Sequence, residues 1–263
     1  MKLSLLKQNF EKYGLYIKTI ENKSILKQVR DCIKEFFYSD SSNLRWSHEL
    51  SKEDFHELTL NCQNKINEIG VQQKIFKSEE KFLKNICDDE ILHESVCFLR
   101  AIRPANSSLT NEAVDYHRET MYSDDSHTTK AINIWIPILN VNHETSLRYI
   151  PSSHLVDDKD IIVQEDKVAS RVEKGSTGHK LGFLYAPKKI ISGVNFNNAE
   201  RIKFPDDGYA CFSAMLVHGG GNNTSNDIRF ALSIGLLPKS SAKGIKPFTA
   251  ANGKPQFVEF NGL

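Results

Sequence analysis

The sequence GYACFSAMLVHGGGNNTSNDIRFALSIGLLP, residues 208–238, holds two apolar runs separated by glycine, asparagine and serine. Each run is short and rich in β-branched or aromatic residues, which is typical of buried β-strands. The glycines and polar residues between the runs predict a tight connection. We expect a hairpin that sets Arg229, at the head of the second strand, beside His218, at the end of the first, with both side chains in one cavity.

Runs of the same character recur from about residue 95 onward. They are SVCFLRAIRP, AINIWIPIL, SLRYIPSS and RIKFPDDGYACFSA, and turn-forming residues lie between them. Many short strands with such turns predict a sandwich or barrel rather than a parallel α/β sheet. The simplest architecture is a double-stranded β-helix, which is the jelly roll of cupin-like proteins.

The first part of the chain predicts helices. Apolar residues recur at helical spacing in residues 21–37, and helical stretches follow at 52–69 and 78–86. The opening segment predicts a short helix that turns at Gly14 into a strand. We therefore expect one domain over 1–263, mainly β with flanking helices. It comprises a mostly helical flank (1–94), a jelly-roll core (95–238) and a C-terminal tail (239–263).

The composition argues against several classes of protein. The chain has 34 lysines and arginines against 33 aspartates and glutamates, a formal net charge of +1, so we expect no nucleic-acid partner. Five cysteines without a C-x-x-C pair predict reduced, mostly buried thiols. The first residues lack the apolar core of a signal peptide, and no apolar run is long enough to span a bilayer. We expect a cytoplasmic protein without a membrane partner.

Two histidines and one carboxylate form the strongest candidate site. His117 and Glu119 would point to the same face of an extended strand, toward the distal His218. Among nine histidines about one His-x-acid pair arises by chance, so the context must support the interpretation. Two imidazoles and one carboxylate can occupy one face of an octahedral Fe(II) and leave the other face open. Arg229 would then clamp a cosubstrate carboxylate bidentately.

These residues and their order resemble the phytanoyl-CoA dioxygenase-like branch of the Fe(II)/2-oxoglutarate-dependent oxygenases. The matching positions are His117, Glu119, Tyr122, Trp135, the turn Pro151-Ser152-Ser153-His154, His218 and Arg229, over roughly the C-terminal half of the chain. The resemblance implies that His117, Glu119 and His218 are the catalytic metal ligands and that Arg229 holds 2-oxoglutarate. Trp135 is then either a neighbour of 2-oxoglutarate or a core residue, and Asn133, on the same strand face, is a further candidate to bond it.

The resemblance also implies the reaction. The cofactors are Fe(II), 2-oxoglutarate and O2, with ascorbate as a candidate reductant, and a C–H bond of a small molecule is hydroxylated with release of succinate and CO2. Two positions depart from the family pattern: Glu119 stands where aspartate is commoner, and Ser152 where glycine is usual. Related halogenases replace this carboxylate with a small residue, so Glu119 favours hydroxylation.

Two other functions stay open at this point: a cupin-like metalloenzyme with different chemistry, and a non-catalytic β-sandwich that binds a small molecule or a partner. Residues 157–193 read as a long loop, which together with the tail is a candidate lid. Basic residues gather in this loop, either as a solvated face or as a rim for an anionic substrate. They are Arg171, Lys174, Lys180, Lys188 and Lys189.

Overall fold

The computed structural model of the chain describes residues 2–38, 47, 49–105, 113–122, 126–165, 172, 175–182, 188–242, 253 and 255–259. Its α-helices are α1 (Lys2–Tyr13), α2 (Lys23–Phe37), α3 (Lys52–Glu68), α4 (Val71–Cys87) and α5 (Thr177–Lys180). Its 3₁₀ turns are η2 (Glu119–Tyr122), η3 (Ser126–Lys130), η4 (Ser153–Leu155), η5 (Asp158–Asp160), η6 (Phe196–Asn198) and η7 (Lys239–Ala242). Within the described part of the chain, no helix is long and apolar enough to cross a membrane.

The strands form a large sheet and two small ones. They are β1 (Leu15–Thr19), β2 (Ile91–Glu94), β3 (Phe98–Ile102), β4 (Ile132–Leu139), β5 (Arg148–Tyr149), β6 (Ile162–Glu165), β7 (Lys188–Ser192), β8 (Glu200–Arg201), β9 (Gly208–Ser213), β10 (His218–Gly219), β11 (Arg229–Pro238) and β12 (Phe257–Glu259). The seven-stranded main sheet has the order β1-β9-β4-β11-β2-β12, with β3 also paired to β11. The minor sheet has the order β10-β5-β8, and β6 pairs with β7.

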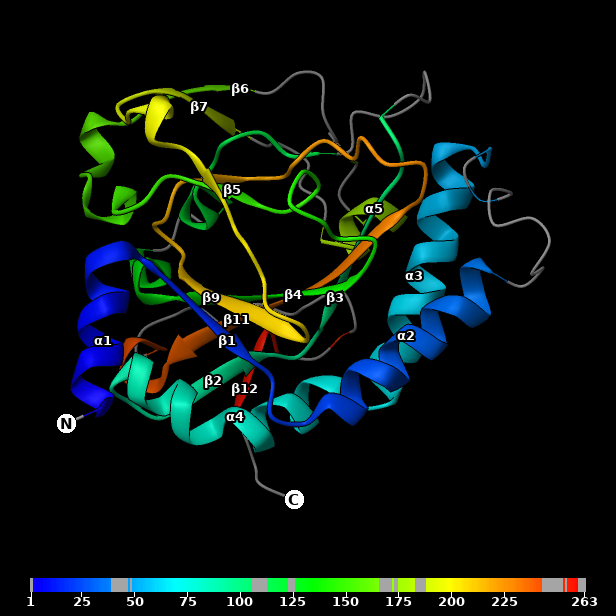
Figure 1. Cartoon of the computed structure of the whole chain (residues 1–263), viewed down its shortest axis with the longest axis horizontal. Helices are drawn as coiled ribbons and strands as arrows, with labels where there is room; N and C mark the ends of the chain where they lie inside the picture. Colours follow the sequence, from blue (N-terminus) through cyan, green and yellow to red (C-terminus); the bar gives the residue numbers. More distant parts are fainter. Residues whose placement is uncertain are drawn as a thin grey trace.

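Helices cover one side of the main sheet, and the minor sheet lies on the other. In Figure 1, α2 and α4 run below the main sheet, while β5 and the β6–β7 pair lie above it. All the named strand pairs are antiparallel. The predicted β-rich jelly-roll core with flanking helices is therefore confirmed. The main sheet also takes β1 and β2 from residues 1–94 and β12 from the C-terminal tail.

Alternation along the central strands separates two apolar cores. On β4, Ile134 and Ile136 pack with the helices, while Trp135 packs on the opposite side with Ala231 of β11. Phe230 and Leu232 of β11 belong to the helix-facing core. Because strand side chains alternate between faces, Asn133 and Trp135 of β4 and the odd-numbered residues of β11 face the space between the two sheets. This space is where the candidate site residues gather.

The predicted helices are present, and one is longer than expected. α3 matches the predicted stretch, and α1 turns at Gly14 into β1 as expected. α4 begins at Val71 rather than at Ser78, because Ile75 and Phe76 extend its buried face by two turns. Gly70, in the left-handed conformation at φ 73°, separates α4 from α3.

The predicted hairpin between the strands of His218 and Arg229 is wrong. β9 does not pair with β11, because β4 lies between them in the main sheet. After Ser213 the chain leaves the main sheet, and His218 pairs with Tyr149 in the minor sheet before Arg229 opens β11. Connections that cross between facing sheets are the rule in jelly rolls. The apolar pattern predicts the strands but does not specify their partners.

A buried carboxylate ties α4 to the main sheet. Glu79, whose side chain is fully buried, accepts hydrogen bonds from Tyr209 Oη at 2.8 Å, Lys18 Nζ at 2.5 Å and Glu21 N at 2.7 Å. Three donors satisfy the carboxylate without water, which is the condition for burying a charge in a core. Helix α4 is thereby linked to β1 and β9.

We predict that Glu79→Ala lowers the free energy of unfolding by about 3 kcal/mol, because it leaves the buried Tyr209 hydroxyl and the Glu21 N–H without their acceptor and removes one of the two carboxylates that pair with Lys18. Urea denaturation followed by circular dichroism measures the change. Glu80→Ala is the matched control, since Glu80 makes only an exposed ion pair with Lys84 and should cost less than about 0.5 kcal/mol. Equal losses in the two variants would contradict the assignment.

Candidate metal centre

His117 and His218 are joined through their backbones. His117 N donates to His218 O at 2.8 Å, and His218 N donates to His117 O at 3.0 Å, which forms an isolated antiparallel bridge. The ring centroids are 4.3 Å apart, and both side chains are buried. Directly opposed residues in such a bridge project their side chains to the same side. Two histidines that are 101 positions apart in the numbering therefore meet at one point.

Glu119 reaches the same point from a 3₁₀ turn. The expectation that it shares a strand face with His117 is wrong, because Glu119 begins η2 and its N–H donates to Ala214 O at 3.0 Å. Glu119 Oε1 lies 3.3 Å from His218 Nε2 and 3.9 Å from His117 Nε2. The three candidate ligand atoms all lie within 4.8 Å of one another. The Glu119 side chain is 32% exposed, so the cluster opens on the carboxylate side.

Backbone carbonyls orient both imidazoles. His117 Nδ1 lies 2.6 Å from Asp115 O, and His218 Nδ1 lies 3.0 Å from Leu216 O. A carbonyl oxygen only accepts, so each bond requires a proton on Nδ1 and leaves the Nε2 lone pair facing Glu119. Hydrogen bonds of this kind commonly fix the tautomer of metal-binding histidines.

The protonation states suit a cation. Burial, and then the charge of the neighbouring His218, lower the pKa of His117, which keeps this imidazole neutral. Burial by itself would raise the pKa of Glu119, but its interactions with the rings of His117 and His218 hold this pKa well below its usual value, which keeps the carboxylate ionised. The favoured state is a neutral imidazole at His117 beside an ionised carboxylate, a combination of donors that takes a divalent metal.

Arg118 anchors the segment that carries His117 and Glu119. Its fully buried side chain points away from the cluster and donates through Nη2 to Ser153 O at 2.6 Å and Val156 O at 2.8 Å. Ser153 Oγ in turn accepts the N–H of Val217 at 2.8 Å. One turn therefore supports both the His117 segment and Val217, the residue that precedes β10.

The same turn explains two features of the sequence. Ser152 has φ 62°, in the left-handed region that favours glycine, so a serine there carries local strain. Its hydroxyl donates to Lys12 O at 2.9 Å, which ties the turn to α1. His154 Nε2 bonds Glu11 O at 2.9 Å, and a Cβ at Gly14 would lie 2.4 Å from its Nδ1. His154 therefore braces α1 and lies outside the metal cluster.

The structure brings Arg229 and Trp135 together between the two sheets. Arg229 is 2% exposed, donates through Nη1 to Thr145 O at 3.0 Å, and has its guanidinium carbon 5.6 Å from the Trp135 ring centroid. The Phe212 ring lies tilted against the His218 ring, with the centroids 4.6 Å apart, and belongs to the same apolar cluster as Trp135. Asn133 is partly buried on the Trp135 face of β4. The side chain of the remaining motif residue, Tyr122, lies outside the described residues.

A second carboxylate that the sequence did not reveal lies on the same inner face. Glu94 Oε2 accepts the N–H of Gly235 at 2.6 Å, and a Cβ on Gly235 would lie 2.8 Å from the Glu94 carboxylate carbon. Gly235 pairs with Asn133 of β4. The pKa of Glu94 is raised to about 7, chiefly by burial and in addition by the charge of Glu119, while hydrogen bonds from Gly235 and Gln256 and the charge of Arg100 act in the opposite direction. Glu94 is the last residue of β2, ILHE, whose side chains alternate between buried and partly buried. This short sequence contains no motif that would identify Glu94 as a site residue.

We predict that Glu94→Gln flattens the pH dependence of stability. A carboxyl whose pKa is raised on folding stabilises the protein below its unfolded value of about 4.5, and this contribution is lost as the pH rises through about 7. Between about pH 5 and pH 8, wild type should lose on the order of 2 kcal/mol that the variant keeps. Thermal unfolding at both pH values measures the difference; parallel curves would refute the buried-acid interpretation.

No protein-family model and no curated protein matches the sequence. Solved structures do match. EvdO2 from Micromonospora carbonacea var. aurantiaca aligns at TM-score 0.60 and 12% identity, over 89% of this chain and 90% of that chain. The non-heme monooxygenase ThoJ aligns at TM-score 0.55 and 12% identity, over 89% and 77%. The epimerase SnoN, in complex with Fe3+, alpha ketoglutarate and nogalamycin RO, aligns at TM-score 0.51 and 12% identity, over 99% of each chain.

The fold is shared with non-heme, alpha ketoglutarate-dependent enzymes. At 12% identity the likeness concerns the fold, and it extends over the helical part as well as the β core, since SnoN covers 99% of the chain. Any function therefore rests on the residues of the site itself.

Proposed function

We propose that this chain is an Fe(II)/2-oxoglutarate-dependent oxygenase, of the phytanoyl-CoA dioxygenase-like kind, that hydroxylates an unactivated C–H bond of a small-molecule metabolite or biosynthetic intermediate. The observation that carries the proposal is the cluster of His117, Glu119 and His218, whose three donor atoms converge from separate segments. The fold shared with alpha ketoglutarate-dependent enzymes supports it.

The donor set fits iron. Two imidazole Nε2 atoms and one carboxylate oxygen form the facial set of non-heme Fe(II) oxygenases, which leaves positions open for other ligands. The carbonyls of Asp115 and Leu216 hold both rings so that Nε2 faces Glu119. Held by these residues, iron would activate O2, the oxidant, so that 2-oxoglutarate is oxidised to succinate and CO2 and a C–H bond of the substrate is hydroxylated.

Arg229 is proposed to hold the distal carboxylate of 2-oxoglutarate. Its guanidinium is buried between the sheets, on the side of β11 that faces Trp135. A guanidinium binds a carboxylate strongly where water is excluded, and its planar fork sets the direction of the ligand. Trp135 would form one wall of the cosubstrate site, and Asn133 would add a polar contact.

Hydroxylation is the outcome we favour because Glu119 occupies the position that a halide would need. The substrate is proposed to be a small molecule that carries an anionic group. Lys180 and Lys188 are exposed in the described parts of residues 157–193, whereas Arg171 and Lys174 lie outside the described residues. The lid proposed for residues 157–193 and for the tail likewise falls partly outside them.

We predict that anaerobic addition of Fe(II) and 2-oxoglutarate produces a weak visible charge-transfer band in the wild-type protein. His117→Ala and His218→Ala should abolish the band, because each removes one of three ligands. His143→Ala is the matched control, since this exposed histidine lies outside the cluster. An unchanged band in both ligand variants would sink the iron assignment.

Binding of iron without any 2-oxoglutarate-dependent release of succinate would favour a cupin-like enzyme of other chemistry. No stoichiometric iron after anaerobic reconstitution would favour a non-catalytic protein.

We predict that Arg229→Ala weakens 2-oxoglutarate binding at least about tenfold and leaves Fe(II) affinity within about twofold. The change removes the guanidinium that would pair with the cosubstrate carboxylate and leaves the three metal ligands in place. Titration of the charge-transfer band with 2-oxoglutarate measures the first quantity, and iron stoichiometry after dialysis checks the second. Normal cosubstrate affinity in a folded variant would contradict this role.

A further inference from the structure

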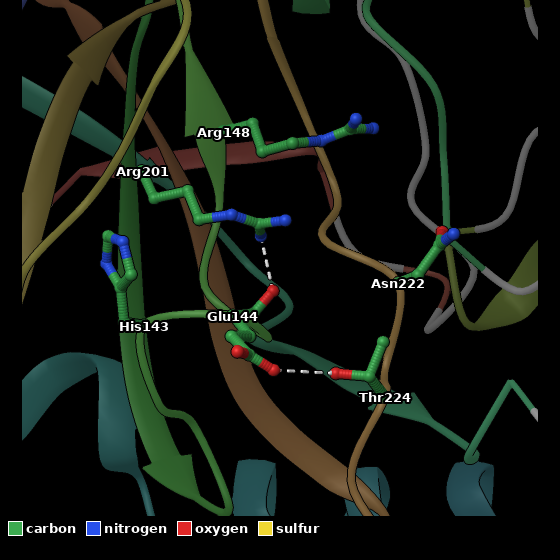
Figure 2. Close-up of a pocket in the computed structure, with 6 residues that line it drawn as sticks. All are labelled: His143, Glu144, Arg148, Arg201, Asn222 and Thr224. Carbon is green, nitrogen blue, oxygen red and sulfur yellow. Dashed lines mark hydrogen bonds between the residues drawn. The ribbon is translucent and has the colours of Figure 1, made fainter.

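A polar pocket, about 490 Å³ in volume, lies at the minor sheet, outside the metal cluster. It is lined by His143, Glu144, Arg148, Arg201, Asn222 and Thr224. Figure 2 shows the Arg148 and Arg201 side chains running side by side into this pocket, with Glu144 and Thr224 below them and Asn222 opposite. None of the six residues belongs to the candidate metal site.

We propose that this pocket binds the phosphate group of a small molecule. Arg148 of β5 and Arg201 of β8 are direct register partners across two antiparallel strands. Like charges placed directly opposite each other destabilise a strand pair, so this arrangement costs free energy until an anion offsets it. Paired guanidinium groups that share one face are also well suited to bind phosphate oxygens.

Both guanidinium groups keep hydrogen-bonding capacity for a ligand. Arg148 Nε donates to Gly220 O at 3.2 Å, and its Nη2 lies 3.8 Å from the nearer Asp115 carboxylate oxygen, too far for a hydrogen bond. Arg201 Nη1 donates to the backbone oxygen of Glu144. Within the described residues, neither arginine has a carboxylate at hydrogen-bond distance. Each therefore has N–H groups left for an oxyanion.

The side chain of Glu144, the one acidic residue of the pocket lining, is hydrogen-bonded to Thr224 and not to the arginines. Glu144 Oε2 accepts the hydroxyl of Thr224 at 3.2 Å, while Arg201 bonds the Glu144 backbone rather than its side chain (Figure 2). Among the six lining residues two guanidinium groups outnumber one carboxylate, which favours a phosphate monoester of charge about −1.5 to −2, and the Asp115 carboxylate, 3.8 Å from Arg148 Nη2, offsets part of this positive charge. Glu144 nevertheless opposes the anion, and this makes its removal informative.

The glycine run that follows His218 packs closely against two of the pocket residues, Glu144 and Arg201. A Cβ at Gly221 would lie 2.6 Å from Ser146 O, 2.8 Å from Glu144 O and 2.8 Å from Arg201 Nη1. Only glycine at this position lets Arg201 reach the Glu144 carbonyl, so the orientation of Arg201 is built into the backbone. The packing is less close at Gly219, where a Cβ would lie 3.2 Å from the Asp115 carbonyl carbon.

The test is isothermal titration of the whole chain, without metal, with inorganic phosphate and with glycerol 3-phosphate at constant ionic strength in chloride. Wild type should bind saturably, and Arg148→Gln and Arg201→Gln should each weaken binding at least about tenfold. Lys203→Gln, which removes an exposed cation just after β8 outside the pocket, is the matched control and should bind within about twofold of wild type. Because no metal or 2-oxoglutarate is present, the result is independent of the proposed oxygenase activity.

Glu144→Gln provides a test that does not depend on loss of function. It removes the opposing charge at constant size, so it should tighten phosphate binding by about threefold or more. Equal affinity for the two probes would indicate a site for free phosphate, and tighter binding of the ester would indicate the phosphate of a larger ligand. Absence of saturable binding, wild-type affinity in both arginine variants, or no tightening in Glu144→Gln would overturn the proposal.

Discussion

The reciprocal backbone hydrogen bonds between His117 and His218 are the constraint on which the candidate site depends. They join the end of the segment that precedes η2 to a strand of the minor sheet, and they set the two rings 4.3 Å apart. The Nδ1 bonds to Asp115 O and Leu216 O then turn both Nε2 atoms toward Glu119. Backbone geometry therefore preorganises the donors, so a metal does not have to bring them together at an entropic cost.

The two faces of the main sheet differ in composition: one is apolar, and the other carries the charged groups of the candidate site. Its helix-facing side is apolar and includes Ile134 and Leu232, with Glu79 as a fully hydrogen-bonded exception. Its other side carries Arg229, which lies beside Trp135, and Glu94, which lies against Gly235. Polar and charged groups inside a protein destabilise it unless they have partners or a ligand. Their gathering on one face is the expected mark of a binding space, and the apolar face provides the stability that such a space lacks.

Prediction from the sequence succeeded where a pattern is local. Helical spacing located α2 and α3, and the apolar runs located β4 and β11, because each pattern reflects which side of one element is buried. It failed where the outcome depends on a distant partner. The hairpin of His218 with Arg229 was wrong because β4 inserts beside β9, and Glu119 lies in a 3₁₀ turn although the alternation of His117 and Glu119 suits a strand.

The sequence by itself determined the β-rich class, the flanking helices and the set of residue types that suits a non-heme iron site. Only the tertiary structure decided that His117 and His218 meet across a backbone bridge, that Glu94 lies over Gly235, and that Arg148 and Arg201 share one face. The physical reason is that strand partners come from long-range pairing, whose register depends on the whole sheet and not on the local alternation of side chains.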